Sequence, residues 1–320
     1  MLKTIARRLI IMIPQLFIIA CITFALSWLM PGDFVSLQIG EDRTWSEIQA
    51  MREQLGLDDP WYIQFWRWLG SVIRGDFGIS AQHARPVIDV IGERAINTFW
   101  LSLMSTVMFF IIAIPLGILA GRFSGRLPDK VILTYGFVGL ALPALVYAIL
   151  LIFVFAIRLD WLPARGSVEA FAVGTGFGEF VSRIRHLILP SIALSTFGGI
   201  TTIYLLRTQI IDGKSSDYAT TARSKGIPER VIFNKHILRN SLIPFAQSIG
   251  LVFIGLLIGS VLIERIFMYP GMGDLFLTSI QIRDFNVASA LIVIYAALTV
   301  VGVLIGDIAL TLADPRIRVK

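Results

Sequence analysis

The chain has 320 residues, of which 56% are hydrophobic and only 16% charged, a composition far more apolar than that of an average soluble domain and indicative of a membrane protein. The net charge of +6 does not indicate a nucleic-acid partner, because the basic residues are spread between hydrophobic runs. The single cysteine, Cys21, excludes an intrachain disulfide and any cysteine-based metal or redox centre, and we expect it to pack as a small apolar side chain.

The first predicted element is a membrane-spanning helix, which makes up the N-terminal unit over residues 1–32. Three basic residues precede a charge-free run over 9–32, which is long enough at 1.5 Å per residue to cross about 30 Å of hydrocarbon. A cleaved signal peptide is the rival interpretation, but its apolar region would be only about 7–15 residues and would end in a small-residue cleavage site. No such site precedes Pro31, so we predict a helix that stays in the protein.

Residues 33–94 are polar and form the predicted extracytoplasmic region. They hold ten acidic and six basic residues together with four tryptophans. We predict a short helix over 51–57, a turn or cap over 58–60, and an amphipathic, aromatic-rich helix over 61–73. The tryptophans are more typical of a belt at the membrane interface than of a ligand cage.

Five more charge-free runs are each long enough to span the membrane, which makes six predicted spanning helices in an all-α fold. Pro115, Pro143 and Pro190 fall in or at the start of these runs, where packing against neighbouring helices makes a kink tolerable. Gly255 and Gly259 are small enough for close helix packing, either inside one subunit or between subunits. The five runs cover residues 95–121, 131–157, 186–206, 240–263 and 285–306.

The basic residues predict the orientation, since cytoplasmic segments hold the excess of Lys and Arg. With the N-terminus inside, the inner segments hold 16 of the 28 basic residues but only 6 of the 22 acidic residues. Both termini and the polar segment over 207–239 are then cytoplasmic. We therefore predict a five-helix core over 95–312 that contains this segment, followed by a cytoplasmic tail over 313–320.

The stretch over 215–244 has helix signals of its own. Ser215, Ser216 or Asp217 can cap a helix N-terminus, and Gly226 is placed to end that helix in the left-handed conformation. Pro228 then suits the first turn of a second helix, whose apolar side runs over 231–238. This pattern predicts a helix of about two turns, a glycine stop, and a second helix that leads back into the membrane.

The run over 217–226, Asp-Tyr-Ala-Thr-Thr-Ala-Arg-Ser-Lys-Gly, resembles the cytoplasmic EAA loop of bacterial ABC-importer permeases, in the form used by the dipeptide, oligopeptide and nickel group. Thr220, Thr221 and Ala222 stand where the general pattern has a glutamate and two alanines, and Arg239 replaces its later proline. Both departures are typical of the peptide subgroup. Further motifs that resemble this group lie at residues 30–33, 55–60, 74–78, 85–87, 264–273, 283–285 and 314–318, so the resemblance covers about residues 5–318.

The resemblance implies a type I ABC importer permease, multi-pass in the bacterial cytoplasmic membrane, that moves dipeptides or oligopeptides. It implies as partners a second homologous permease subunit, an extracytoplasmic peptide-binding protein, and two cytoplasmic ATPase subunits that would bind the ATP and the magnesium.

The resemblance further implies that the helix over 217–226 is a coupling helix, which docks into a cleft on an ATPase subunit. Tyr218, Ala219 and Ala222 share one helix face, where we expect small side chains to allow close approach to the ATPase. The alternative is an ordinary amphipathic connector on the membrane surface. The coupling residues implied by the resemblance are Asp217, Tyr218, Ala219, Thr221, Ala222, Arg223, Lys225 and Gly226.

We predict no enzyme activity, no metal site and no cofactor in this chain. It has no Gly-rich Lys-Ser/Thr phosphate loop, and its three histidines lie in three segments without metal-ligand spacing. Charged residues are almost absent from the predicted helix interiors, which disfavours an ion-coupled secondary transporter. A membrane scaffold without transport is a third class, and a permease for nickel or another small solute is the nearest alternative within the same group.

Overall fold

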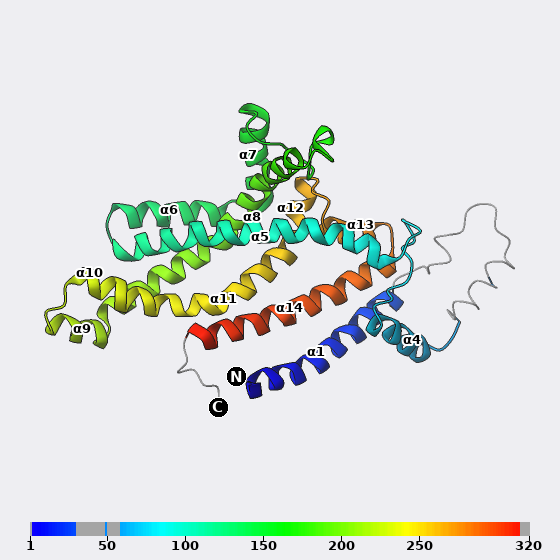
Figure 1. Cartoon of the computed structure of the whole chain (residues 1–320), viewed down its shortest axis with the longest axis horizontal. Helices are drawn as coiled ribbons and strands as arrows, with labels where there is room; N and C mark the ends of the chain where they lie inside the picture. The colour runs from blue at the N-terminus through cyan, green and yellow to red at the C-terminus, as the bar shows by residue number, and fades with distance from the viewer. Residues whose placement is uncertain (1, 30–48, 50–57, 314–320) are drawn as a thin grey trace. The chain divides into compact units, whose positions relative to one another are not determined.

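The computed structural model describes residues 2–29, 49 and 58–313, which are almost entirely helical (Figure 1). Within them the one β-type pairing is an isolated bridge between Ile79 and Pro86. The short helix predicted over 51–57 lies outside the described residues, as do the motifs over 30–33 and 314–318. The predicted all-α fold with several apolar helices is confirmed.

The chain divides into two compact units, each built from two stretches of sequence. The first comprises Met1–Asn97 and Gly271–Val300, and the second comprises Thr98–Pro270 and Val301–Lys320. Two long helices, α5 (Val87–Arg122) and α14 (Phe285–Ala313), contribute residues to both units. The first unit also holds α1 (Leu2–Leu29), α4 (Trp61–Ile73) and α13 (Met272–Gln281).

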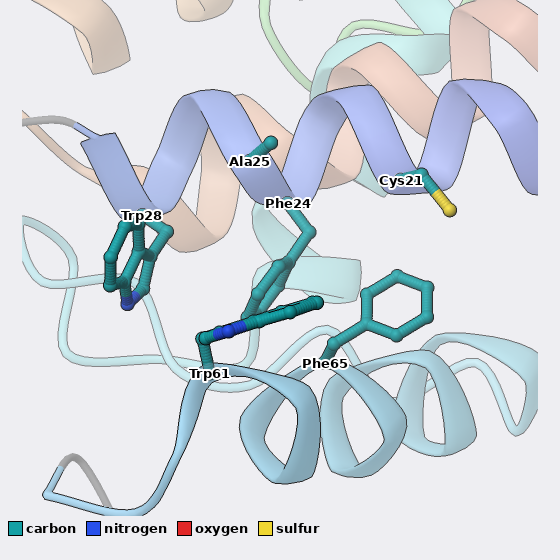
Figure 2. A pocket seen from close by; sticks show the side chains of 6 residues that line it. All are labelled: Cys21, Phe24, Ala25, Trp28, Trp61 and Phe65. Atoms are coloured by element: carbon teal, nitrogen blue, oxygen red, sulfur yellow. The ribbon is translucent and has the colours of Figure 1, made fainter.

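The amphipathic helix predicted over 61–73 is α4, which packs its aromatic side on α1. It begins directly after Pro60, the last residue of the predicted turn or cap, and its buried side chain is Phe65 (Figure 2). The ring of Phe65 lies 6.1 Å from that of Phe17 and 5.4 Å from that of Phe24, both in edge-on geometry. Aromatic contacts therefore hold α4 against the first spanning helix of the chain.

The second unit is built around α8 (Phe177–Ser215), which contacts α6 (Leu127–Ala141), α7 (Ala144–Leu151) and α11 (Leu238–Gly259). Buried apolar side chains such as Leu101 of α5 and Leu189 of α8 form its main core. Shorter elements complete the unit, namely η1 (Ile152–Arg158), η2 (Ala170–Ala172), α9 (Asp217–Ser224), α10 (Glu229–Val231), η3 (Ile232–Ile237) and α12 (Val261–Ile266).

Three helices are long and apolar enough to cross a membrane among the residues that the structure describes. They are Ile10–Leu29 in α1, Val87–Arg122 and Phe285–Ala309. Two bent helix pairs raise the number to five if each pair is one span. The remaining predicted run, 240–263, covers most of α11 and continues through Ser260 into α12, and several side chains of α11 fall outside the described residues.

The run predicted as one span over 131–157 is broken in the structure. α6 and α7 meet at an angle of 106° around Leu142 and Pro143. Pro143 has no N–H to continue the hydrogen-bond ladder, and it drives the preceding residue to extended backbone, as seen in the ψ of 127° at Leu142. The kink expected at Pro143 is therefore a complete helix break. The second bent pair lies within α8 and turns by 46°.

A glycine lets α6 lie directly on α8. A Cβ atom at Gly136 would collide with the phenol of Tyr204, whose hydroxyl donates to the carbonyl of Leu133 at 3.1 Å. Small residues at such contacts are typical of membrane bundles, because they let backbones approach closely. At Gly255, by contrast, no atom of the described chain lies within 4 Å of the Cβ position.

An ion pair also joins α6 to α8, near the start of α6. Asp129 is 1% exposed and accepts hydrogen bonds from Nε of Arg207 at 2.6 Å and from its Nη2 at 2.8 Å. The backbone N–H of Gly125 donates to the same carboxylate at 2.7 Å. The bidentate geometry and the third hydrogen bond offset the cost of removing the carboxylate from water. One side chain thus holds together two helices and the turn before them.

We predict that Gly136→Ala destabilises the second unit, because the new methyl group needs the space of the Tyr204 phenol and breaks its hydrogen bond. Overpacking with loss of a hydrogen bond costs about 1–3 kcal/mol. Thermal unfolding of the purified permease in detergent would measure the loss. Gly92→Ala is the matched control, since nothing lies within 4 Å of its Cβ position. Equal midpoints for Gly136→Ala and the wild type would contradict the close contact.

We predict an asymmetric response to breaking the Asp129–Arg207 pair. Arg207→Ala leaves a buried carboxylate without its counter-charge and should cost about 3–5 kcal/mol. Asp129→Ala should cost less, because the Arg207 side chain is 23% exposed and reaches water. In a double-mutant cycle read by unfolding, the combined variant should lose less than the sum of the two single losses. Strictly additive losses would show that the two groups do not interact.

Candidate functional site

The predicted helix with a glycine stop is α9, and the structure confirms both features. Ser216 has extended backbone and Asp217 begins the helix. Gly226 follows it with a φ of +73°, the left-handed region that only glycine adopts without strain. The N–H groups of Gly226 and Ile227 donate to the carbonyls of Arg223 and Ala222 at 2.9 and 3.2 Å, which closes the C-terminus.

The capping prediction is correct in position but wrong in chemistry. Ser216 occupies the N-cap position, yet its hydroxyl makes no hydrogen bond to the N–H groups of α9. The hydroxyl donates instead to the carbonyl of Gly213 at 2.7 Å, in the last turn of α8. Ser216 therefore closes the preceding helix. The second predicted helix starts after Pro228, as expected, and continues from α10 through η3 into α11.

The face of α9 that carries the two alanines is buried within the chain. Ala219 is fully buried and Ala222 is 7% exposed. They pack in one apolar cluster with residues of α8, η3 and α11, namely Leu206, Ile210, Ile232, Phe233, Ile237 and Phe245. The expectation that these alanines face outward toward a partner is wrong. Their small size lets α9 lie close to α8, η3 and α11. Burial of their methyl groups in this cluster is more favourable than exposure to water.

The rest of the surface of α9 is exposed and mostly polar, including Tyr218, which neighbours Ala222 on the helix. It carries hydroxyl and basic groups, and Tyr218 is the one large apolar side chain on it, at 39% exposure. This face has the composition of a surface that can bind a hydrated or polar partner. Its exposed residues are Asp217, Tyr218, Thr220, Thr221, Arg223 and Ser224, followed by Lys225.

Hydrogen bonds from Lys214 and Arg223 link α9 and the end of α8 to neighbouring helices. The ammonium of Lys214 donates to the carbonyls of Gly121 and Arg122 at 2.7 and 2.9 Å, at the C-terminus of α5. A cation at this position also opposes the negative end of the helix dipole. Arg223 donates through Nη1 to the carbonyl of Lys214 at 2.8 Å and through Nε to Glu229 at 2.6 Å. α9 is thus linked to α8 and α10 directly, and to α5 through Lys214.

A cation–π contact adds a further link at this end of the unit. The guanidinium of Arg122 lies 5.1 Å from the ring centroid of Phe233 on η3 and 5.7 Å from that of Phe123. Sequence reasoning did not identify Lys214 or Arg122 as part of the site. The available signal was the position of Lys214 near the end of a long helix, where a basic side chain often bonds terminal carbonyls.

The described residues contain no group of three or more His, Cys, Asp or Glu side chains that could hold a metal ion. His83 lies in the loop before α5, His186 lies on α8, and His236 lies on η3. His186 is buried and its Nδ1 contacts the carbonyl of Ser182 at 2.8 Å, which is a local helix contact. The structure therefore brings none of the histidines together.

Comparison with known proteins matches two family descriptions along the chain. Residues 113–319 match "Binding-protein-dependent transport system inner membrane component", and residues 1–104 match the N-terminal family of the same transport systems. The chain is also similar to proteins named "Glutathione transport system permease protein GsiC" in Escherichia coli (strain K12), Shigella dysenteriae serotype 1 (strain Sd197) and Shigella flexneri serotype 5b (strain 8401). Each is 35% identical over 320 residues, which covers the whole of both chains. The chain belongs to the binding-protein-dependent transport system inner membrane components, the multi-pass permease subunits of ABC importers.

Proposed function

We propose that this permease moves short peptides into the cell. The observation that supports this proposal is the 35% identity, over the full length of both chains, to permeases named for glutathione transport. Glutathione is itself a peptide. The form of the segment over 217–226, with Thr220 and Thr221 in place of the general glutamate and alanine, also favours the peptide group. Nickel or another small solute is the alternative substrate within the same group.

We further propose that the energy comes from two separate cytoplasmic ATPase subunits, which bind ATP and magnesium. The absence of a phosphate loop from the sequence supports this division of labour. The remaining partners in the proposal are a second, homologous permease subunit and an extracytoplasmic peptide-binding protein.

α9 is the proposed coupling helix, with two kinds of residue in different roles. Tyr218, Thr221 and Lys225 are exposed and available for docking on an ATPase subunit. Ala219 and Ala222 act from the buried side, where they seat α9 on the apolar cluster. Asp217 begins the helix and Gly226 ends it.

Arg223 and Lys214 give this helix a mechanical connection to the rest of the unit. Because Arg223 bonds both the end of α8 and the start of α10, a displacement of α9 is transmitted to both. Lys214 passes the same displacement to the C-terminus of α5. Packed elements of this kind move as rigid bodies, since a close-packed interior transmits strain. ATP-driven movement of the docked subunit would in this way tilt the spanning helices.

We predict that Tyr218→Ala combined with Lys225→Glu abolishes uptake while the permease still inserts in the membrane, because both residues are exposed and neither lies on a predicted spanning run. Lys130→Glu, an exposed charge reversal on α6, is the matched control and should transport normally. The measurement is uptake of a labelled peptide beside the membrane level of each variant. Ala222→Glu is unsuitable for this purpose, since a carboxylate in the buried cluster destabilises the fold itself. Normal uptake in the double variant would remove the docking proposal and leave the surface-connector interpretation.

The substrate proposal predicts that cells producing the complete transporter take up a labelled tripeptide in an ATP-dependent manner and do not accumulate nickel. Cells that produce the ATPase subunits without this permease are the control. Uptake of nickel ions without peptide uptake would refute the peptide assignment and retain the importer.

A further inference from the structure

The helix that follows α9 changes its winding for one turn. α10 ends at Val231, η3 runs over Ile232–Ile237 as a π-helix, and α11 continues directly from Leu238. The N–H of Leu238 donates to the carbonyl of Phe233, five residues back, where an α-helix would bond four residues back. The π-helix η1 ends its helix at Arg158, whereas η3 has helix on both sides. η3 therefore holds one extra residue inside a continuous helix.

The residues of η3 give the α-helix little intrinsic support. The run over 231–237 is Val-Ile-Phe-Asn-Lys-His-Ile, and every residue except Lys235 ranks below the unbranched helix formers in α-helix propensity. The side chains of Asn234 and Lys235 are exposed, and no hydrogen bond or ion pair holds either of them within the described part of the chain. π turns inside α-helices are rare and occur mostly at functional sites. The winding of this turn can therefore change without the loss of a side-chain hydrogen bond.

η3 lies between a tightly bonded group of helices and the long helix α11 (Figure 1). Arg223 of α9 donates to Glu229 of α10 at 2.6 Å and to the carbonyl of Lys214, at the end of α8, at 2.8 Å. α11 is attached to α8 by a 3.2 Å hydrogen bond from the hydroxyl of Ser241 to the carbonyl of Gln209, and by apolar packing. Apolar attraction is non-directional, so α11 can change its angle to α8 while these side chains stay buried.

We infer that η3 is a hinge at which α11 changes its angle to α9 and α10 during transport. The inference rests on the proposed coupling role of α9, and it adds the place where the movement enters α11. A π turn that returns to α-helical winding releases one residue, which corresponds to a rotation of about 100° and a rise of about 1.5 Å. Hinges of this kind consist of a few residues at the end of an element. An unbroken α-helix from α10 into α11 would carry both as one rigid rod.

Deleting Asn234 removes the extra residue and keeps the buried side of the helix. Ile232 and Ile237 are then four residues apart, the spacing that places two side chains on one side of an α-helix. The test uses the complete transporter, purified with the subunits that accompany this permease and reconstituted in vesicles. We expect the deletion variant to retain the ATPase subunits and an unfolding midpoint close to that of the wild type.

Uptake of a labelled tripeptide by the same vesicles should fall by about tenfold or more, because the hinge has become a stiff α-helix. Asn234→Ala is the matched control, since it changes the same exposed side chain but keeps the chain length, and it should take up the tripeptide at the wild-type rate. Uptake at the wild-type rate in the deletion variant would overturn the hinge.

The hinge and the docking proposal fail in different variants. Normal uptake by Tyr218→Ala combined with Lys225→Glu refutes docking through α9, whatever the deletion of Asn234 does. Loss of the ATPase subunits from the purified deletion variant would show that η3 shapes the docking surface, and would overturn the hinge while leaving the docking proposal in place.

A second measurement reads the turn itself and does not depend on the deletion variant. Spin labels on Val231→Cys and Asn240→Cys, in a Cys21→Ala background, report the distance across η3 in the complete transporter. We expect this distance to differ between the nucleotide-free state and the state trapped with ATP and vanadate. Labels on Val131→Cys and Leu140→Cys are the matched control, because these exposed positions have the same separation on the α-helix α6, and their distance should stay constant. An unchanged distance across η3 would overturn the hinge even if the deletion variant does not fold.

Discussion

The buried pairing of Asp129 with Arg207 is the interaction on which the α9 end of the second unit depends. A carboxylate that is 1% exposed persists only because a guanidinium and a backbone N–H meet its oxygens. The pair fixes the register of α6 along α8, and this register places Gly136 beneath the phenol of Tyr204. With α6 and α8 held, the C-terminal end of α8 lies beside α5, within reach of the Lys214 contacts.

From this anchored end, the chain builds a short helix with two different faces. Burial of Ala219 and Ala222 determines how closely α9 lies on α8, η3 and α11. The hydrogen bonds of Arg223 to α8 and α10 determine the orientation of α9. η3 is a π-helical turn, in which the wider backbone brings Ile232, Phe233 and Ile237 into the same buried cluster. Other exposed side chains of this segment, such as Thr221 and Lys225, remain accessible on its surface.

In the first unit, α1 and α4 are joined by a different kind of interaction. Its α1–α4 contact consists of aromatic rings, which bury much area but leave gaps where flat edges meet.

The amino-acid sequence by itself determined those features that depend on neighbours a few residues apart. α4 starts after Pro60, α9 ends at the left-handed Gly226, and the long apolar helices follow from composition, because proline, glycine and hydrophobic runs act locally. The motif over 217–226 likewise identified the permease family from a contiguous stretch. The tertiary structure alone decided which face of α9 is buried, since an alanine face reads the same whether it meets its own chain or a partner. It also decided that the break at Pro143 bends the run by 106°, and that Lys214 and Arg122 belong to the site. These features rest on contacts between residues distant in sequence, whose strength depends on burial and geometry that no local pattern encodes.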